Sequence, residues 1–285
     1  MIISKCTNEN ADQITLDDCL ACSGCISSNE KYNYISDKHI LDTILSKVCF
    51  IISPYVKLNL FSKLGNNNWE LFEKKIVQWI KIQYKAIMVV DTSYFNTKGN
   101  NVIGTECPGV VLYVEKMFPH LLPYLSTTKS KLQLAIEYLQ TLYRDTPIIA
   151  LQQCYDKKDE IIKENYSNVY LIGLKDIKID KIDLSIVPSN DLNEWEKSKQ
   201  ECLDSIEGLN NSLSFFKTFI PNKFSKTQNI FICNNGCFNG PALLKNQNIF
   251  MEKIVYFKLP HNSTIWFSSS ARSFKIKTKN FNIEW

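Results

Sequence analysis

Three cysteines near the N-terminus are spaced closely enough to bind one inorganic centre together. Cys19, Cys22 and Cys25 stand in the run CLACSGC, with two residues between neighbours. Structural zinc sites usually take their ligands from two separated cysteine pairs, whereas an unbroken run of this spacing can wrap a cubane iron–sulfur cluster. The pattern favours a [4Fe-4S] cluster, and it leaves a zinc loop or unligated thiols as alternatives.

A cubane cluster needs a fourth thiolate. Cys6 lies thirteen residues before Cys19 in the same polar segment, so a loop can return it at a small entropic cost. The small residues inside the cysteine run also allow the backbone to curl close to a cluster. We therefore expect residues 1–45 to form an N-terminal [4Fe-4S]-binding lobe. Its ligands would be Cys6, Cys19, Cys22 and Cys25.

Four later cysteines form a second possible set, and their positions say more than their spacing. Cys154 comes almost directly after the apolar run PIIALQ, and Cys233 ends the run NIFIC. Ligands of open α/β sheets collect beyond the carboxyl ends of strands, so thiols there can converge. Cys107 precedes Pro108, which suits the first turn of a helix, and helix N-termini favour anions. Cys237 completes the set, although single cysteines are also common as small buried hydrophobic residues.

The remaining cysteines and the histidines show no ligand pattern. Cys49 and Cys202 have no partner at a suitable spacing and are expected to pack in the core. The three histidines are too scattered along the chain to form a site.

The segments that must position the second set alternate between strands and helices. Short β-branched runs predict strands, and amphipathic or polar–apolar periodic segments predict helices. The predicted strands are 47–53, 86–91, 147–152, 168–174, 183–188 and 229–233, and the predicted helices are 69–84, 130–143 and 191–207. This alternation predicts an α/β body with a parallel or mixed sheet covered by helices. We assign the body to residues 46–275 and a C-terminal tail to 276–285.

The composition and charge of the chain disfavour several classes of function. The 285 residues are 45% hydrophobic, and the net charge of +4 is spread along the chain. No basic block indicates nucleic-acid binding, and no apolar run reaches the roughly 18 residues of a membrane span. The N-terminus lacks the apolar core of a signal peptide, so we expect a cytoplasmic protein. Its ten cysteines would then be reduced, which favours metal binding over disulfides.

The cysteine-bearing segments also carry a family resemblance. CLACSGC, TECPGVVLYVEKMFPHLLPYLSTTKS (105–130), CYDKKDE (154–160) and CNNGCFNG (233–240) resemble, in order, the four cysteine motifs of the hydrogenase-like assembly factors of the cytosolic iron–sulfur pathway, relatives of nuclear prelamin A recognition factor. The resemblance implies an iron-only hydrogenase large-subunit-like fold, with two α/β lobes enclosing a buried cluster. It implies one [4Fe-4S] cluster on each set of four. Those sets are Cys6, Cys19, Cys22 and Cys25, and Cys107, Cys154, Cys233 and Cys237.

The resemblance further implies an adaptor between the cluster scaffold and the targeting complex that serves cytosolic and nuclear apoproteins. An electron-transfer protein is the alternative, and an active hydrogenase is disfavoured because Glu106 stands where a proton-delivering thiol is needed. The family's Pro-Cys is replaced by Gln153-Cys154, its aromatic after Cys-Pro-Gly by Val110, and its glycine-rich continuation by GPALL.

Two further features gain meaning from the resemblance. Lys157 and Glu160 match the second motif and could set the charge near the cluster, with a solvated helix face as the competing interpretation. In this pathway, C-terminal hydrophobic–acidic–aromatic tripeptides reach the targeting complex. Ile283, Glu284 and Trp285 form such a tripeptide and are the predicted partner-binding residues.

Overall fold

The computed structural model describes residues 36–43, 47–64, 68–95, 103–187, 205–220 and 227–244. The N-terminal cysteine run, Cys202 and the C-terminal tripeptide lie outside these ranges. The predicted N-terminal lobe and tail, with the boundaries that separate them from the body, therefore remain predictions.

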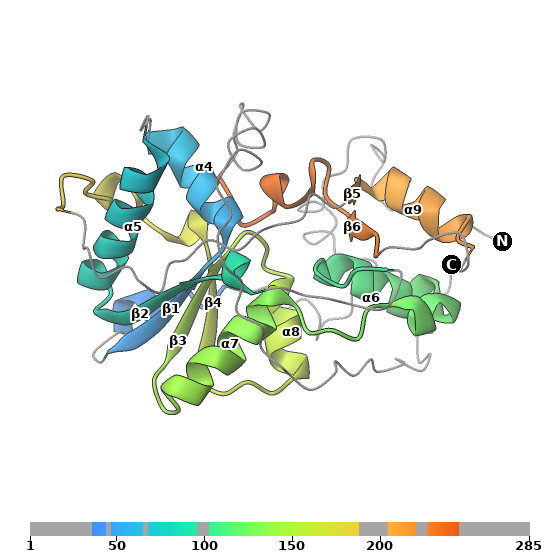
Figure 1. Ribbon diagram of the computed structural model, residues 1–285, viewed down its shortest axis with the longest axis horizontal. Helices are drawn as coiled ribbons and strands as arrows, with labels where there is room; N and C mark the ends of the chain where they lie inside the picture. Colours follow the sequence, from blue (N-terminus) through green and yellow to red (C-terminus); the bar gives the residue numbers. More distant parts are fainter. Residues whose placement is uncertain are drawn as a thin grey trace.

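A four-stranded parallel sheet is the centre of the larger part of the molecule (Figure 1). Its strands are β1 (Val48–Ile52), β2 (Ala86–Asp91), β3 (Ile148–Gln152) and β4 (Val169–Gly173), in the order β2-β1-β3-β4. Every residue of β1 and β3 is buried, as expected for parallel strands covered on both faces. The predicted α/β architecture is confirmed.

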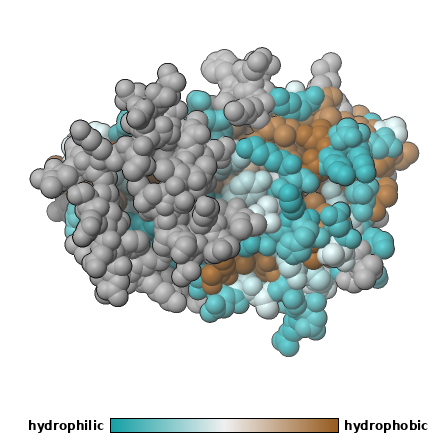
Figure 2. All heavy atoms as spheres, turned by 180° about the vertical axis from the view of Figure 1, so that it is seen from behind, coloured by the Kyte–Doolittle hydropathy of each residue, from teal (hydrophilic) through white to brown (hydrophobic). Residues whose placement is uncertain are grey.

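Helices cover both faces of this sheet (Figure 1). α4 (Pro54–Leu64) and α5 (Trp69–Gln83) pack with Phe50 on one face. α7 (Lys131–Leu142) and α8 (Lys157–Lys163) pack with Ile51 on the other. Successive side chains of a strand point to opposite faces, so β1 supplies both apolar clusters. Figure 2 shows hydrophobic side chains also on the outer surface, on the side where α4 and α5 lie.

The ends of the helices follow local sequence signals. Ser130 precedes α7, and its hydroxyl accepts a hydrogen bond from the backbone N–H of Gln133, whose side chain accepts in return from the backbone of Ser130. This capping box satisfies two donors that the helix itself cannot. Asn68 caps α5 by accepting from the backbone N–H of Leu71. Both helices begin within one or two residues of their predicted positions.

A second, smaller region contains a two-stranded parallel sheet (Figure 1). β5 (Ser205–Glu207) pairs with β6 (Asn229–Phe231), and α6 (Pro108–Met117) and α9 (Leu209–Lys217) pack beside them. Phe216 is buried at the centre of an apolar cluster that both helices and β6 share. The remaining short elements are α3 (Ile40–Thr43), η2 (Thr92–Tyr94), η3 (Pro119–Tyr124), η4 (Leu174–Asp176), η5 (Ile179–Lys181) and η7 (Gly236–Asn239).

Two predicted elements are wrong. Residues 183–187 of the predicted strand 183–188 form no strand. Leu184 and Ile186 instead pack against the apolar cluster beneath α4 and α5, so their alternation reflects half-burial without strand pairing. The predicted helix 191–207 is wrong at its end, because residues 205–207 form β5. Its remainder lies outside the described residues.

Candidate metal centre

Cys107 occupies the N-cap of α6, with Pro108 at the first helical position, as predicted. Its sulfur accepts hydrogen bonds from the backbone N–H groups of Ile232 and Val110. Ile232 directly follows β6, so the thiol that begins α6 also touches the end of the smaller sheet. Burial raises the pKa of Cys107, and the two backbone N–H donors partly oppose this because they favour the thiolate.

The other three cysteines come from two further segments. Cys154 lies two residues beyond β3, and its sulfur accepts from the backbone of Asp156. Cys233 lies two residues beyond β6, and Cys237 lies within η7. The expectation that thiols would follow the carboxyl ends of parallel strands is met at both sheets.

The structure brings the four thiols close enough to influence one another electrostatically. Burial, and then the charges of Asp156, Cys233 and Cys107, raise the pKa of Cys154 well above its ordinary value. Burial and the charge of Cys107 raise the pKa of Cys237 to about 12. Burial and mutual repulsion make it costly to ionise four neighbouring thiols when no cation is near. A bound metal centre lowers this cost, because its positive charge offsets the charges of the thiolates.

The spacing of the four thiols helps to distinguish a site for a single metal ion from a site for an iron–sulfur cluster. Among the described residues, no group of three or more His, Cys, Asp or Glu is gathered as ligands of one metal ion. Zinc holds each sulfur at about 2.3 Å, which draws its ligands tightly together. A [4Fe-4S] cluster is a larger body held by four thiolates.

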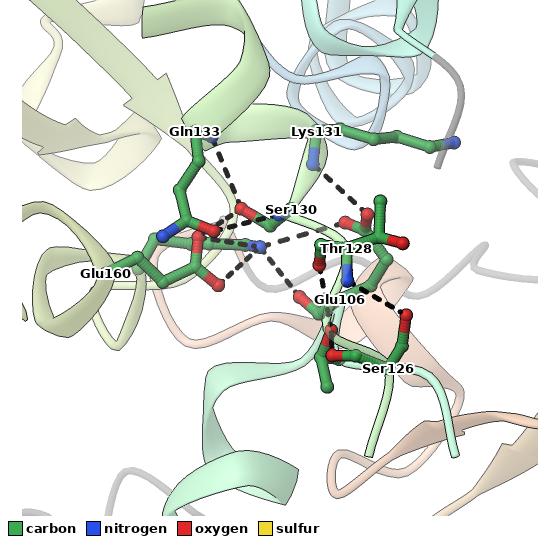
Figure 3. A network of polar contacts seen from close by, with 9 residues as sticks. Glu106, Ser126, Thr128, Ser130, Lys131, Gln133 and Glu160 are labelled. Atoms are coloured by element: carbon green, nitrogen blue, oxygen red, sulfur yellow. Dashed lines mark hydrogen bonds and ion pairs between the residues drawn. The ribbon is translucent and has the colours of Figure 1, made fainter. Parts of the chain in front are cut away.

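A buried polar network supports this site from one side (Figure 3). The Lys157 ammonium donates to the backbone carbonyl of Glu106 at 2.7 Å and to the Glu160 carboxylate at 3.2 Å. Ser130 donates to the other oxygen of Glu160, and the Glu106 carboxylate accepts from the backbone N–H of Lys131 at 3.1 Å. The network ties the segment before Cys107 to the helix that follows Cys154.

This network decides between the two interpretations of Lys157 and Glu160. Lys157 is 3% exposed and Glu160 is fully buried, so the solvated helix face is wrong. Burial alone would lower the pKa of Lys157, but the charges of Glu160, Glu106 and Cys237 outweigh it and raise the pKa. The ammonium therefore stays charged beside the thiols.

A family comparison agrees with this arrangement. The model of the C-terminal domain of the iron-only hydrogenase large subunit matches residues 46–208. The chain belongs to this iron-only hydrogenase family. The match covers the four-stranded sheet and the segments that carry Cys107 and Cys154.

Curated relatives of this chain carry a functional name. "Cytosolic Fe-S cluster assembly factor NAR1" of Encephalitozoon cuniculi is 24% identical over 95% of this chain and 94% of its own length. The proteins of the same name from Candida dubliniensis and Kluyveromyces lactis are 28% and 27% identical, over 55% and 66% of this chain. The aligned parts make up 32% and 46% of those two longer relatives.

Solved structures of the iron-only hydrogenase family show the same fold. The apo [FeFe]-hydrogenase HydA1 from Chlamydomonas reinhardtii, variant C377H, aligns with a TM-score of 0.57 and 12% identity, over 78% of this chain and 88% of its own. The structure titled "Stepwise [FeFe]-hydrogenase H-cluster assembly revealed in the structure of HydA(deltaEFG)" aligns equally well, with a TM-score of 0.57. In the described parts of the chain, no helix is long and apolar enough to cross a membrane.

Of the remaining residues named in the sequence analysis, some are described by the structure and others lie outside the described ranges. Cys49 is completely buried in β1, where burial raises its pKa to about 12, which confirms its expected role in core packing. Val110, which stands where the assembly-factor motif that the sequence resembles has an aromatic residue, is also completely buried. Cys6, Cys19, Cys22 and Cys25 lie outside the described residues, as do Ile283, Glu284 and Trp285.

Sequence reasoning missed two contributors to the site. Gln153 stands where the assembly-factor motif that the sequence resembles has a proline, and its side chain hydrogen-bonds the Cys237 sulfur. Ser130 closes the Lys157–Glu160 network. Position next to a cysteine and the capping pattern were the available signals, but neither reveals a contact across the fold.

Proposed function

We propose that this chain is a cytosolic iron–sulfur cluster assembly factor that holds two [4Fe-4S] clusters. The observation that carries the proposal is the convergence of Cys107, Cys154, Cys233 and Cys237, which come from separate segments, at the ends of the two parallel sheets. The assembly role and the cytosolic location come from the names of the relatives.

The donor set fits the proposed second cluster. Four thiols are soft ligands, and soft thiolates suit iron–sulfur clusters. Backbone N–H groups already point at the sulfurs of Cys107 and Cys154, and such donors commonly surround ligand sulfurs. When bound, the cluster would supply the positive iron charge that offsets the repulsion between the thiolates.

The segment GPALL that follows Cys237 packs closely against the residue before Cys154. Ala242 and Leu243 are buried, and the backbone N–H of Ala242 donates to the Gln153 carbonyl at 3.1 Å. The segment after Cys237 therefore packs closely without the glycine-rich continuation.

The first cluster is proposed for Cys6, Cys19, Cys22 and Cys25, on the cysteine spacing and the family resemblance. Its lobe, residues 1–45, is small and polar, so metal binding would supply much of its folding free energy.

Anaerobic reconstitution with iron and sulfide tests both sites. The wild-type chain should bind about eight iron atoms, because each [4Fe-4S] cluster has four. Cys22→Ser and Cys237→Ser should each retain about half of that iron, and the spectrum of the missing cluster should differ between the two variants. Binding of zinc with no visible cluster absorption would contradict the proposal.

We propose that the chain has no hydrogenase activity. Glu106 stands where the resemblance places a proton-delivering thiol, and its carboxylate accepts from the backbone N–H of Lys131. Hydrogen evolution from reduced viologen by the reconstituted chain, after maturation of a di-iron site, would contradict this. The electron-transfer alternative predicts rapid exchange with a reductase and no stable binding to assembly proteins.

The proposed partners are the cluster scaffold and the targeting complex. We propose that Ile283, Glu284 and Trp285 bind the targeting complex, because a terminal Trp can bury a large apolar area while the carboxylates meet positive groups. Deleting these residues should abolish capture by the complex and leave iron content unchanged. Equal capture by the truncated chain would remove this role.

A further inference from the structure

Gln153 links two cysteine-bearing segments that lie far apart in the chain. It follows the last residue of β3 and precedes Cys154, and only 5% of its surface is exposed. Its side chain hydrogen-bonds the sulfur of Cys237. Its backbone carbonyl accepts from the backbone N–H of Ala242 at 3.1 Å. Gln153 therefore contacts Cys237 through its side chain and the segment after Cys237 through its backbone.

Gly240 shows how closely the two segments approach. A Cβ atom at Gly240 would lie 2.2 Å from the carbonyl oxygen of Gln153, a distance that no side chain can adopt. The backbone N–H of Gly240 also bonds to the carbonyl of Cys237 at 3.3 Å. The absence of a side chain at Gly240 thus permits close backbone contact between Gln153 and the segment after Cys237.

The direction of the side-chain bond follows from its chemistry. A ligand thiolate carries no hydrogen, so the Cys237 sulfur accepts and the Nε2 group of Gln153 donates. The Oε1 atom of Gln153 is consistent with this orientation of the amide, because it is buried and has no hydrogen-bond partner among the described residues. A buried amide that leaves its oxygen unsatisfied and keeps its donor on a sulfur is held there by the surrounding packing.

We propose that Gln153 is a positioning residue for the second cluster, donating a hydrogen bond from Nε2 to the ligand sulfur of Cys237. This inference rests on the proposed function. Hydrogen bonds to ligand sulfurs are one of the means by which a protein sets the potential of a cluster. The donor stabilises the more negative reduced form over the oxidised form, and so it raises the reduction potential. A proline at this position, as in the motif that the sequence resembles, would have no side-chain donor.

Redox titration of the reconstituted full chain, followed by electron paramagnetic resonance, tests the proposal. Gln153→Met removes the donor and keeps the side-chain length and the backbone carbonyl. It should lower the potential of the second cluster by up to about 59 mV, which is a tenfold change for a one-electron couple. Gln153→Glu replaces the donor with an acceptor and should lower the potential further. Gln152→Met is the matched control, because Gln152 is equally buried but its Nε2 has no partner in the described part of the chain.

The outcomes separate this inference from the proposed function. If the wild-type chain binds no second cluster, the proposed function fails. If the cluster is present but Gln153→Met and Gln153→Glu keep the wild-type potential, only the role of Gln153 fails. Equal shifts in the Gln153 variants and the Gln152 control would also overturn it. If Gln153→Met does not fold, the comparison of Gln153→Glu with the control decides.

Discussion

The two parallel sheets of this chain receive very different apolar support. β1 and β3 are buried at every residue, and helices pack on both faces of their sheet. β5 and β6 have three residues each, and Ser205 in β5 is exposed. Two-stranded sheets are marginal on their own and need packing from other elements. The comparison teaches that the larger sheet has apolar support of its own on both faces, whereas the smaller one depends on its aromatic neighbours.

Two sets of buried charge occupy different places in the fold. The larger region contains Lys57 of α4, which pairs with Glu73 of α5 and Asp91 at the end of β2, with all three side chains at most 8% exposed. The network of Lys157 and Glu160 instead lies at the junction with Cys107. One buried set of charges thus belongs to the sheet, and the other belongs to the site.

The largest effect is expected for Lys57→Met, which removes the charge that Glu73 and Asp91 share. Breaking a buried ion pair leaves an uncompensated charge, so the free energy of unfolding should fall by about 3–5 kcal/mol. Urea unfolding of the iron-free chain at neutral pH measures this. A loss below about 1 kcal/mol, the size expected for a surface pair, would show that the larger sheet does not depend on this charge.

The difference in stability between the wild type and Lys57→Met should depend on pH. Burial alone would lower the pKa of Lys57, but the charges of Asp91 and Glu73 outweigh it and raise the pKa. A raised pKa stabilises the fold fully below the unfolded-state value of about 10.4, and this stabilisation is lost as the pH rises through the folded-state value. Between these two pKa values the wild type should lose stability as the pH rises, and Lys57→Met should lack this loss. Parallel unfolding curves in the two proteins would exclude Lys57 as the titrating group.

A matched pair of core substitutions compares the two sheets directly. Ile149 of β3 and Ile230 of β6 are both almost completely buried. Ile→Ala substitutions cost about 2–5 kcal/mol, and the cost depends on how far the surroundings collapse into the cavity. We expect Ile149→Ala near the upper end, because helices fix both faces, and Ile230→Ala near the lower end. Urea unfolding of both variants checks the order, and the reverse order would mean that the smaller region is the more rigid one.

A smaller effect is expected at Ser130, which caps α7 and donates to Glu160. Ser130→Ala should lower the free energy of unfolding by about 0.5–2 kcal/mol, the usual cost of losing a helix cap. Ser130→Thr keeps the hydroxyl and serves as the control. Thermal unfolding of the iron-free chain measures both. Equal losses in the two variants would assign the effect to packing of the side chain and not to its hydrogen bonds.

The smallest effect is expected at the edge of the larger sheet. Lys158 pairs with Asp37 at 2.6 Å, and Asp37 also accepts from the backbone N–H of Leu171 in β4. Because both charged side chains are partly exposed, Lys158→Met should cost at most about 1 kcal/mol. The exposed Lys38 provides a neighbouring control. Hydrogen exchange at Leu171 reports the contact locally, and unchanged protection would show that Asp37 holds this edge without Lys158.

Much of the fold could be predicted because its signals are local. The apolar runs that became β1, β2 and β3 are short and strongly β-branched. Pro108 marks the start of α6, and Ser130 with Gln133 marks the start of α7. By contrast, the alternating residues 183–187 satisfy the strand pattern but pair with no strand in the described part of the chain. Pairing depends on residues far away in the sequence.

The sequence by itself determined which cysteines follow strands or precede a helix, because strand ends and helix starts depend on neighbouring residue types. Only the tertiary structure decided that Lys157 is buried beside them and that Gln153 reaches Cys237. Exposure and long-range contact depend on which segments cover a residue, and the letters DKKDE suit a solvated helix as well as a buried one. The positions of the cysteines relative to strands and helices can thus be predicted from nearby residues. The burial of Lys157 and the contact of Gln153 with Cys237 depend on the tertiary fold.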